Sequence, residues 1–322
     1  MALDRPATYG GPGFRPRAAT QKEEIRQGSV WAPHAVDSEW TRLLDVVLYL
    51  PGPAIEEVSD PDDALLLAPL SHARLREQHD HLLQRYEECG IRVHRVRNEG
   101  VDDRRHPNLI FQCDIFFMTP LGAVVSRMAG MARAGEERYL ARALAEAGVP
   151  IALTVGGAGT LEGADCMWLT PDKVLCGVGV RTNDEGYEQL RVLLERNGIE
   201  CIRVPIPPVV QHLLGLLQIV APGRALLRGD LASAELLRVL QQAGVEVTTF
   251  PESKEITKAL AFNFLVVDRE RVIAPAGTPG FHKLLGEAGV QIVATVDVSE
   301  YVKAAGGIAC ATGVLGREET PR

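Results

Sequence analysis

The stretch that decides the fold is "LAEAGVPIALTV", residues 144–155, where an amphipathic segment ends, a glycine follows, and alternating aliphatic residues come next. The same pattern recurs as "YEECGIRVHRV" (86–96), "LERNGIECIRV" (194–204), "LQQAGVEVTTF" (240–250) and "LGEAGVQIVATV" (285–296). Apolar residues at helical spacing precede each glycine, and glycine is the residue that most readily ends a helix in the left-handed conformation. The sequence therefore predicts five helix–glycine–strand units.

Paired apolar runs lie between these units, each pair around a polar or proline-containing turn: "IFFMTPLGAVV" (115–125), "MWLTPDKVLCG" (167–177), "LLQIVAPGRALL" (216–227) and "NFLVVDRERVIAP" (263–275). Such hairpins argue against an open parallel sheet, whose strands are joined by crossovers. The last unit is followed only by "GGIACATGVL" (306–315), while an unpaired run, "LLDVVLYL" (43–50), lies near the N-terminus. We infer that the two ends pair and close a five-bladed α/β propeller.

Length and composition are consistent with one large domain. The chain has 322 residues, 46% apolar and 24% charged, enough to bury a full core. We expect a polar N-terminal extension at residues 1–40, partly disordered, a single α/β-propeller domain at 41–316, and a polar tail at 317–322.

The charge balance and the cysteines limit the classes of partner. A net charge of −8, from 34 Lys and Arg against 42 Asp and Glu, provides no basic stripe for nucleic acid and suits a small cationic ligand. Six scattered cysteines without a C-x-x-C pair indicate free thiols in a reducing compartment. With no apolar leader or membrane-length run, we expect a cytoplasmic protein that binds no membrane.

Four polar residues stand in apolar or glycine-rich contexts, each in a different repeat: Asp114 in "IFQCD", Glu162 in "GTLEGAD", His212 in "QHLLG" and Cys310 in "GGIAC". Taken singly, each has an ordinary structural explanation, such as a buried thiol, a core imidazole or a turn cap. Together they supply a nucleophile, a proton carrier and two carboxylates that suit a cation, and a closed ring brings them to one axis.

The collinear order of "IFQCD", "VSRMAGMARAGEE", "GTLEGAD", "GVGVRTNDEG", "HLLG", "NFLVV", "PAGTP" and "GGIAC" resembles the guanidino-group-modifying enzymes. That superfamily includes arginine deiminase, dimethylarginine dimethylaminohydrolase and the amidinotransferases, and the second of these is the most similar branch. The resemblance covers about Leu43 to Thr312. It implies the five-bladed propeller called a pentein, with a central active site.

The resemblance also implies a mechanism without metal or organic cofactor. Cys310 attacks the guanidinium carbon, and His212 protonates the leaving nitrogen and then activates water. Glu162 and Asp114 hold the cationic nitrogens, and Asp165 helps to position the site, although a purely structural role for Asp165 has equal weight.

By the same comparison, Arg127 and Arg181 hold a substrate carboxylate, which makes an amino acid the expected substrate. For Arg127 the alternative is a solvated surface residue. For Arg181 it is a structural role, because "TNDE" beside it has capping-box spacing from Thr182 to Glu185.

Three positions depart from family patterns. Asn108 falls where the dimethylarginine-hydrolysing branch can have an aspartate that holds the substrate amino group. Cys113 replaces the Arg or Glu found before Asp114. Leu214 replaces the acid of the H-x-D pair in arginine deiminases, which favours the hydrolase branch.

The leading hypothesis is therefore a hydrolase of arginine or an N-substituted arginine, which proceeds through an amidino-cysteine and gives citrulline plus ammonia or an amine. An amidinotransferase uses the same residues, and a non-catalytic propeller that binds a macromolecule is the alternative of another class. The sequence leaves a homo-oligomer open. We expect Gly306 and Gly307 to let the last inner strand approach a planar substrate.

Overall fold

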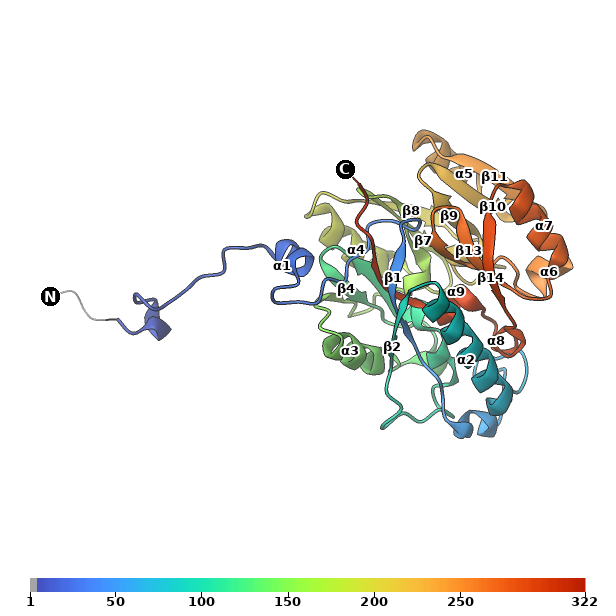
Figure 1. Cartoon of the computed structure of the whole chain (residues 1–322), viewed down its shortest axis with the longest axis horizontal. Coiled ribbons are helices and arrows are strands. Elements are labelled where there is room, and N and C mark those ends of the chain that lie inside the picture. Colours follow the sequence, from blue (N-terminus) through green and yellow to red (C-terminus); the bar gives the residue numbers. More distant parts are fainter. Residues whose placement is uncertain (1–4, 322) are drawn as a thin grey trace.

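The computed structural model describes residues 5–321, and these form five three-stranded sheets. Helices α2, α3, α5 and α7 lie at the periphery of the body, whereas the short helix α9 lies toward its middle (Figure 1). The predicted five-bladed α/β propeller is confirmed.

Each blade joins two antiparallel strands to a third strand that runs parallel to the middle one. Four blades follow the order strand, strand, helix, strand: β3 (Phe116–Thr119), β4 (Gly122–Val125), α3 (Glu137–Glu146), β5 (Ile151–Thr154); β6 (Cys166–Thr170), β7 (Lys173–Val178), α4 (Asp184–Glu195), β8 (Glu200–Pro205); β9 (Leu217–Ala221), β10 (Arg224–Arg228), α5 (Ala234–Gln242), β11 (Glu246–Phe250); and β12 (Leu265–Asp268), β13 (Arg271–Pro275), α7 (Pro279–Glu287), β14 (Gln291–Val296).

The fifth blade closes the ring from both ends of the chain. It contains β15 (Gly313–Arg317), β1 (Leu43–Leu48), α2 (His72–Glu88) and β2 (Arg92–Arg95). Strand β15 runs antiparallel to β1, with Val314 opposite Val46, and β2 runs parallel to β1. The predicted pairing of the two termini is therefore confirmed.

The glycines of the repeat lie where the sequence places them. Gly90, Gly148, Gly244 and Gly289 directly follow the helix C-caps, Gly198 lies two residues after its C-cap, and all five have φ between 70° and 77°. This region is unfavourable for residues with a Cβ, so glycine lets each chain leave its helix and enter the third strand.

Shorter helical elements lie before the first blade, within the blades and between them. The described short helices are η1 (Ala7–Tyr9), α1 (Gln21–Gln27), η2 (Pro53–Glu57), η3 (Pro107–Ile110), η4 (Gln112–Ile115), η5 (Met131–Arg133), η6 (Gly163–Asp165), η7 (Leu213–Gly215), η8 (Gly229–Leu231), α6 (Lys254–Thr257), α8 (Ser299–Lys303) and α9 (Ile308–Ala311). None of the helices in residues 5–321 has the length and apolar character needed to cross a bilayer.

The N-terminal segment contains more regular structure than its composition indicates. Thr20 and Glu23 form a capping box at the start of α1, and Ile25 of this helix is 1% exposed. Residues 5–19, before α1, extend away from the body (Figure 1). Burial of Ile25 anchors α1 to the propeller, as does the hydrogen bond from Ala32 N–H to the Gly148 carbonyl.

Candidate active site

Every blade presents one polar residue just before its first strand. Asp114 lies in η4 before β3, Glu162 immediately precedes η6 and β6, and His212 immediately precedes η7 and β9. Asn263 lies two residues before β12, and Cys310 lies in α9 before β15. The repeat therefore delivers five polar side chains from equivalent places.

The turns that carry these residues pack closely. A Cβ on Gly163, which follows Glu162, would lie 2.0 Å from the Phe116 carbonyl oxygen and 2.4 Å from that of Cys113. Because backbone oxygens cannot move aside cheaply, only glycine fits where η6 meets η4. This close approach brings Glu162 beside Asp114.

His212 lies between the two carboxylates and is 5% exposed. Its Nε2 is 2.7 Å from Glu162 Oε2, and its Nδ1 is 3.7 Å from Asp114 Oδ1. Asp114 Oδ1 is buried and accepts no hydrogen bond. The imidazole is thus held by Glu162, while one oxygen of Asp114 is left free to accept a donor from a ligand.

The buried charges alter the protonation of this group. Burial disfavours the imidazolium, but the carboxylates of Asp114, Glu162 and Asp165 outweigh it and raise the pKa of His212 to about 9. Burial also opposes ionisation of Glu162, but His212, Arg133 and Arg181 outweigh it and lower the pKa of that carboxyl to about 2. At neutral pH the pair is an imidazolium and a carboxylate.

Asn263 holds Cys310 by both ends of its amide. The Nδ2 donates to the Cys310 Sγ at 2.8 Å, and the Oδ1 accepts from the Cys310 N–H at 3.1 Å. Burial, and then the Asp114 carboxylate, raise the pKa of the Cys310 thiol to about 12, although the bond from Asn263 acts in the opposite direction. The unliganded thiol is therefore protonated at neutral pH.

The sequence expectation for the segment around Cys310 needs two corrections. Cys310 lies in the single turn of α9 rather than in an inner strand, and β15 begins only at Gly313. A Cβ on Gly306 would lie 2.2 Å from the Phe111 ring, and one on Gly307 3.0 Å from the Asn263 side chain. The two glycines make room for protein side chains, not for a substrate.

Arg133 is a buried residue of the site that the sequence reasoning missed. Its guanidinium donates to Asp114 Oδ2 at 2.5 Å, to Glu136 Oε2 at 2.9 Å and to the Asn108 carbonyl at 3.2 Å. Asn108 itself uses its side-chain Nδ2 to bond the Ala64 carbonyl at 2.6 Å. Arg133 fixes one oxygen of Asp114, and Asn108 contributes its backbone oxygen to the same network. The signal in the sequence is the arginine inside "MARAGEE", six residues after Arg127.

Asp165 joins two turns through backbone and hydroxyl donors. Its Oδ1 accepts from the Leu213 N–H at 3.0 Å and its Oδ2 from the Thr182 hydroxyl at 2.7 Å. Burial raises the pKa of this carboxyl to about 6. Because Leu213 follows His212 directly, Asp165 fixes the backbone that carries the imidazole.

The capping box expected from Thr182 to Glu185 does not form. The N-cap of α4 is Asn183, whose side chain accepts from the Gly186 N–H at 2.8 Å. Thr182 instead faces inward, where its hydroxyl bonds Asp165 and accepts from the Glu162 N–H at 3.1 Å. The cap is shifted by one residue because Thr182 is recruited to the site.

The two predicted carboxylate holders lie in different surroundings. Arg181 is largely buried, with a guanidinium nitrogen 3.5 Å from Glu162 Oε1. Arg127 is exposed, and its guanidinium donates to the Gly159 carbonyl at 3.3 Å. Neither lines the cavity beside Cys310.

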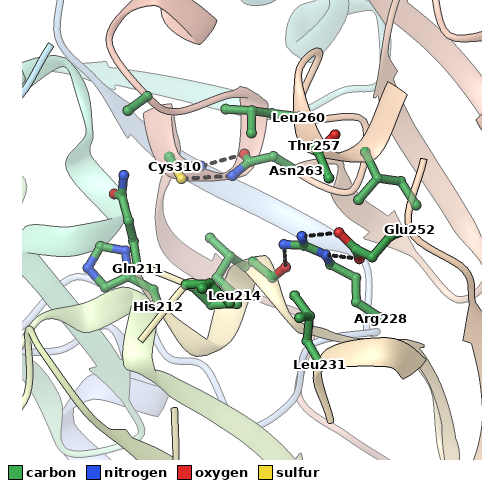
Figure 2. A pocket seen from close by; sticks show the side chains of 15 residues that line it. Gln211, His212, Leu214, Arg228, Leu231, Glu252, Thr257, Leu260, Asn263 and Cys310 are labelled. Atoms are coloured by element: carbon green, nitrogen blue, oxygen red, sulfur yellow. Dashed lines mark hydrogen bonds and ion pairs between the residues drawn. The ribbon is translucent and has the colours of Figure 1, made fainter. Parts of the chain in front are cut away.

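A cavity of about 330 Å³ opens onto both Cys310 and His212. In Figure 2, Cys310 and His212 lie on one side and the ion pair of Arg228 with Glu252 on the other. Arg228 donates to the two Glu252 oxygens at 2.8 and 2.7 Å and to the Gly215 carbonyl at 2.9 Å. The wall between is mostly aliphatic: Val209, Val210, Leu214, Leu231, Ile256 and Leu260.

Asp114, Glu162 and His212 also have ligand atoms within 4.8 Å of one another, as a metal site requires. However, the guanidinium of Arg133 lies 2.5 Å from one of these carboxylates and 3.9 Å from the other. The cluster already contains fixed positive charge, so its geometry favours a ligand that donates hydrogen bonds over a bare cation.

Comparisons with known proteins agree with this architecture. Residues 104–208 match the arginine deiminase family. The dimethylarginine dimethylaminohydrolase of Pseudomonas aeruginosa is 26% identical over 239 residues, covering 74% of this chain and 87% of the relative.

Two solved structures extend the comparison. A dimethylarginine dimethylaminohydrolase, crystallised as an adduct with 4-chloro-2-hydroxymethylpyridine, superimposes with a TM-score of 0.67 at 25% identity, over 84% of this chain and 98% of the other. SxtG, an amidinotransferase from Microseira wollei, gives a TM-score of 0.72 at 18% identity, over 90% and 99%, and shares the fold.

Proposed function

We propose that this chain, which belongs to the guanidino-group-modifying enzymes, is a cysteine-dependent hydrolase of arginine or an N-substituted arginine. The observation that carries the proposal is the cavity that Cys310 and His212 share. The unpaired Asp114 Oδ1 lies next to His212, 3.7 Å from its Nδ1, behind the cavity lining. A planar cation that donates several hydrogen bonds matches the free carboxylate oxygen, and its carbon is an electrophile for sulfur.

The first half of the reaction follows from the protonation states. When a guanidinium ion binds beside Cys310, its charge favours loss of the thiol proton to solvent. The thiolate forms a bond to the guanidinium carbon, and the imidazolium of His212 gives its proton to the departing nitrogen as the C–N bond breaks. The products are an amidino-cysteine and ammonia or an amine.

The second half uses the neutral imidazole left behind. His212 takes a proton from a water molecule whose oxygen attacks the amidino carbon, and the C–S bond then breaks. The hydroxyl proton of the released product passes to solvent, and a neutral urea product leaves with the Cys310 thiolate and the imidazolium restored. Glu162 stabilises the imidazolium in both halves, and Asp165 maintains its position through Leu213.

The finer proposal concerns the substrate tail. Arg228 and Glu252 form a fixed pair of opposite charges in the cavity wall. The carboxylate and ammonium of an α-amino acid complement such a pair, with the carboxylate at Arg228 and the ammonium at Glu252. The aliphatic wall suits the methylene chain between head and tail. We therefore place arginine-type amino acids ahead of simple alkylguanidines.

The test combines intact mass with product analysis. Purified protein is incubated with arginine or an N-methylated arginine, with and without an amine such as ornithine. We expect citrulline without any amine, and an increase of amidino size on Cys310 when the reaction is quenched. Cys310→Ser should abolish both, and His212→Gly, which lacks the proton donor for the leaving nitrogen and the base for water, should abolish citrulline formation. Cys89→Ser, a substitution at the partly buried end of α2, is the matched control.

Other outcomes separate the alternatives. A new guanidino product that forms only with an acceptor amine would indicate an amidinotransferase instead. Full turnover by Cys310→Ser, or no protection of Cys310 from alkylation by any guanidino compound, would refute the catalytic proposal and leave the non-catalytic binding propeller.

A further inference from the structure

A second cluster of histidine and carboxylate side chains lies in the blade that closes the ring. His34 belongs to the segment before β1, Asp45 to β1 and His94 to β2. In the parallel register, Asp45 is opposite Arg92, so His94 lies two residues further along on the same face of the sheet. These residues take no part in the proposed reaction.

The three side chains converge on a small volume. His94 Nε2 is 3.0 Å from Asp45 Oδ1, and His34 Nδ1 is 3.7 Å from Asp45 Oδ2. One potential ligand atom from each residue lies within 4.8 Å of the other two. The two imidazole rings meet edge to face, with centroids 5.3 Å apart.

The strand on the other side leaves space for the cluster. Gly316 of β15 is opposite Asp45, and a Cβ at this glycine would lie 3.4 Å from His34 Nδ1 and 3.7 Å from the Asp45 side chain. A Cβ there would make only van der Waals contact, and glycine leaves the two ligand groups without a side-chain neighbour from residue 316.

His34 supplies an independent observation that indicates a ligand. The residue is 3% exposed, and its Nδ1 has no hydrogen-bond partner although it points toward Asp45. Buried polar nitrogens are nearly always satisfied, so an unpartnered one next to a carboxylate requires an explanation. A hydrogen-bonded pair of His94 with Asp45 explains two of the three residues but leaves His34 unexplained.

We propose that His34, Asp45 and His94 bind a divalent transition-metal ion of the zinc type. Two imidazoles and one carboxylate form a ligand set that Zn²⁺ accepts, and three protein ligands leave a position for water. The His94 side chain is 26% exposed, so solvent reaches this position. The ion would tie the segment before β1 to the closing blade.

One neighbouring charge opposes the ion. Arg92 Nε lies 3.4 Å from Asp45 Oδ1, but this side chain is 72% exposed and is free to turn into solvent. The proposal therefore predicts that Arg92→Ala strengthens metal binding, an effect that a purely structural His–Asp–His network would not produce.

The experiment uses the full chain after removal of metal with a chelator. Zn²⁺ is titrated by calorimetry, and Co²⁺ is followed by its visible absorption. We expect one ion per chain at this site, its loss in His34→Ala and His94→Ala, and tighter binding in Arg92→Ala. His81→Ala, on the exposed face of α2, is the matched control. Guanidino hydrolysis should persist in the metal-free protein.

A second measurement covers variants that fold poorly. His94→Gln keeps a donor for Asp45 but is a poor metal ligand. Zn²⁺ should raise the Tm of the starting protein but not of His94→Gln, because a ligand of the folded state stabilises it in proportion to occupancy. The metal site is refuted if the starting protein binds no Zn²⁺. It is also refuted if the His34 and His94 variants bind Zn²⁺ with the same stoichiometry and the same Tm shift as the starting protein. Binding lost only in Cys310→Ser would assign the ion to the cavity beside Cys310 and would likewise overturn the proposal.

Discussion

The hydrogen bond from the Asn263 amide to the Cys310 sulfur gives a quantitative prediction. In Asn263→Ala the thiolate loses its one side-chain donor, at 2.8 Å, while the remaining contributions to the thiol pKa stay in place. A hydrogen bond to a charged group is worth roughly 1.5–3 kcal/mol, and one pKa unit corresponds to about 1.4 kcal/mol. The thiol pKa should therefore rise by roughly 1 to 2 units.

The change is measured as a rate, because the Cys310 pKa already lies near 12. Well below the pKa, the thiolate fraction falls about tenfold per unit, while thiolate nucleophilicity recovers about half of this on a logarithmic scale. The net expectation is that Cys310 reacts with an aromatic disulfide about 3- to 10-fold more slowly. Peptide mass spectrometry separates Cys310 from the other five cysteines.

Two further variants isolate the cause. Asn263→Asp keeps the shape but replaces the donor by a carboxylate, so it should slow the reaction at least as much as Asn263→Ala. Asn197→Ala removes an exposed asparagine that bonds the Leu193 carbonyl and should leave the rate unchanged. If both Asn263 variants react at the starting rate while retaining their folded structure, the amide does not stabilise the thiolate and the reasoning fails.

The remaining predictions concern proton transfer, the substrate tail and packing. Because the folded pKa of His212, about 9, is raised above its usual value, its contribution to stability is full below about pH 6.5 and is lost as the pH rises through about 9; kcat should fall over the same upper range, and a profile without a fall there would refute the acid role. Arg228→Ala should raise KM for arginine roughly 10- to 100-fold, with a smaller effect on kcat. Arg224→Ala, which removes a glutamate-paired arginine of the same strand, should not change KM. Equal KM values in the two variants would show that Arg228 does not recognise the substrate. Gly306→Ala should lower the free energy of unfolding by about 1–3 kcal/mol, because the new Cβ would collide with a buried ring. Gly286→Ala in α7 should not destabilise the protein, because its Cβ would meet nothing within 4 Å. Chemical denaturation of the two variants measures the difference.

The fold was predictable because its determinants are local. A glycine after each helix, and a turn inside each hairpin, are visible in a few neighbouring residues. Pairing of β15 with β1 spans the whole chain, but it followed from counting hairpins, since a strand was left over at either end. The position of α9 was not predictable, because "GGIAC" carries no periodicity long enough to separate one helical turn from a strand.

The site was predictable only in part, because long side chains reach in directions that local sequence does not set. Arg127 and Arg133 lie in the same motif, yet the backbone bridge between Arg127 and Leu161 leaves the first exposed, while the second turns onto Asp114. Arg228 occupies the third of the five repeats at the end of β10, where it looks like an ordinary surface residue until Glu252 is brought beside it. Tertiary contacts, not motif spacing, decide which arginines face the cavity.

Asn263 could be identified from its position in the repeat, but not from its residue type. Asp114, Glu162, His212 and Cys310 were recognisable by their chemistry, whereas an asparagine before an apolar run resembles an ordinary turn residue. Each of the four precedes the first strand of its blade, and the fourth blade has Asn263 at this place. Since ring closure brings all five places together, the residue there faces the others whatever its type. The repeat therefore determines where a chemical group lies, and the residue type determines what the group does. An amide is neither an acid nor a base near neutral pH, so Asn263 orients the Cys310 thiol while His212 moves the proton.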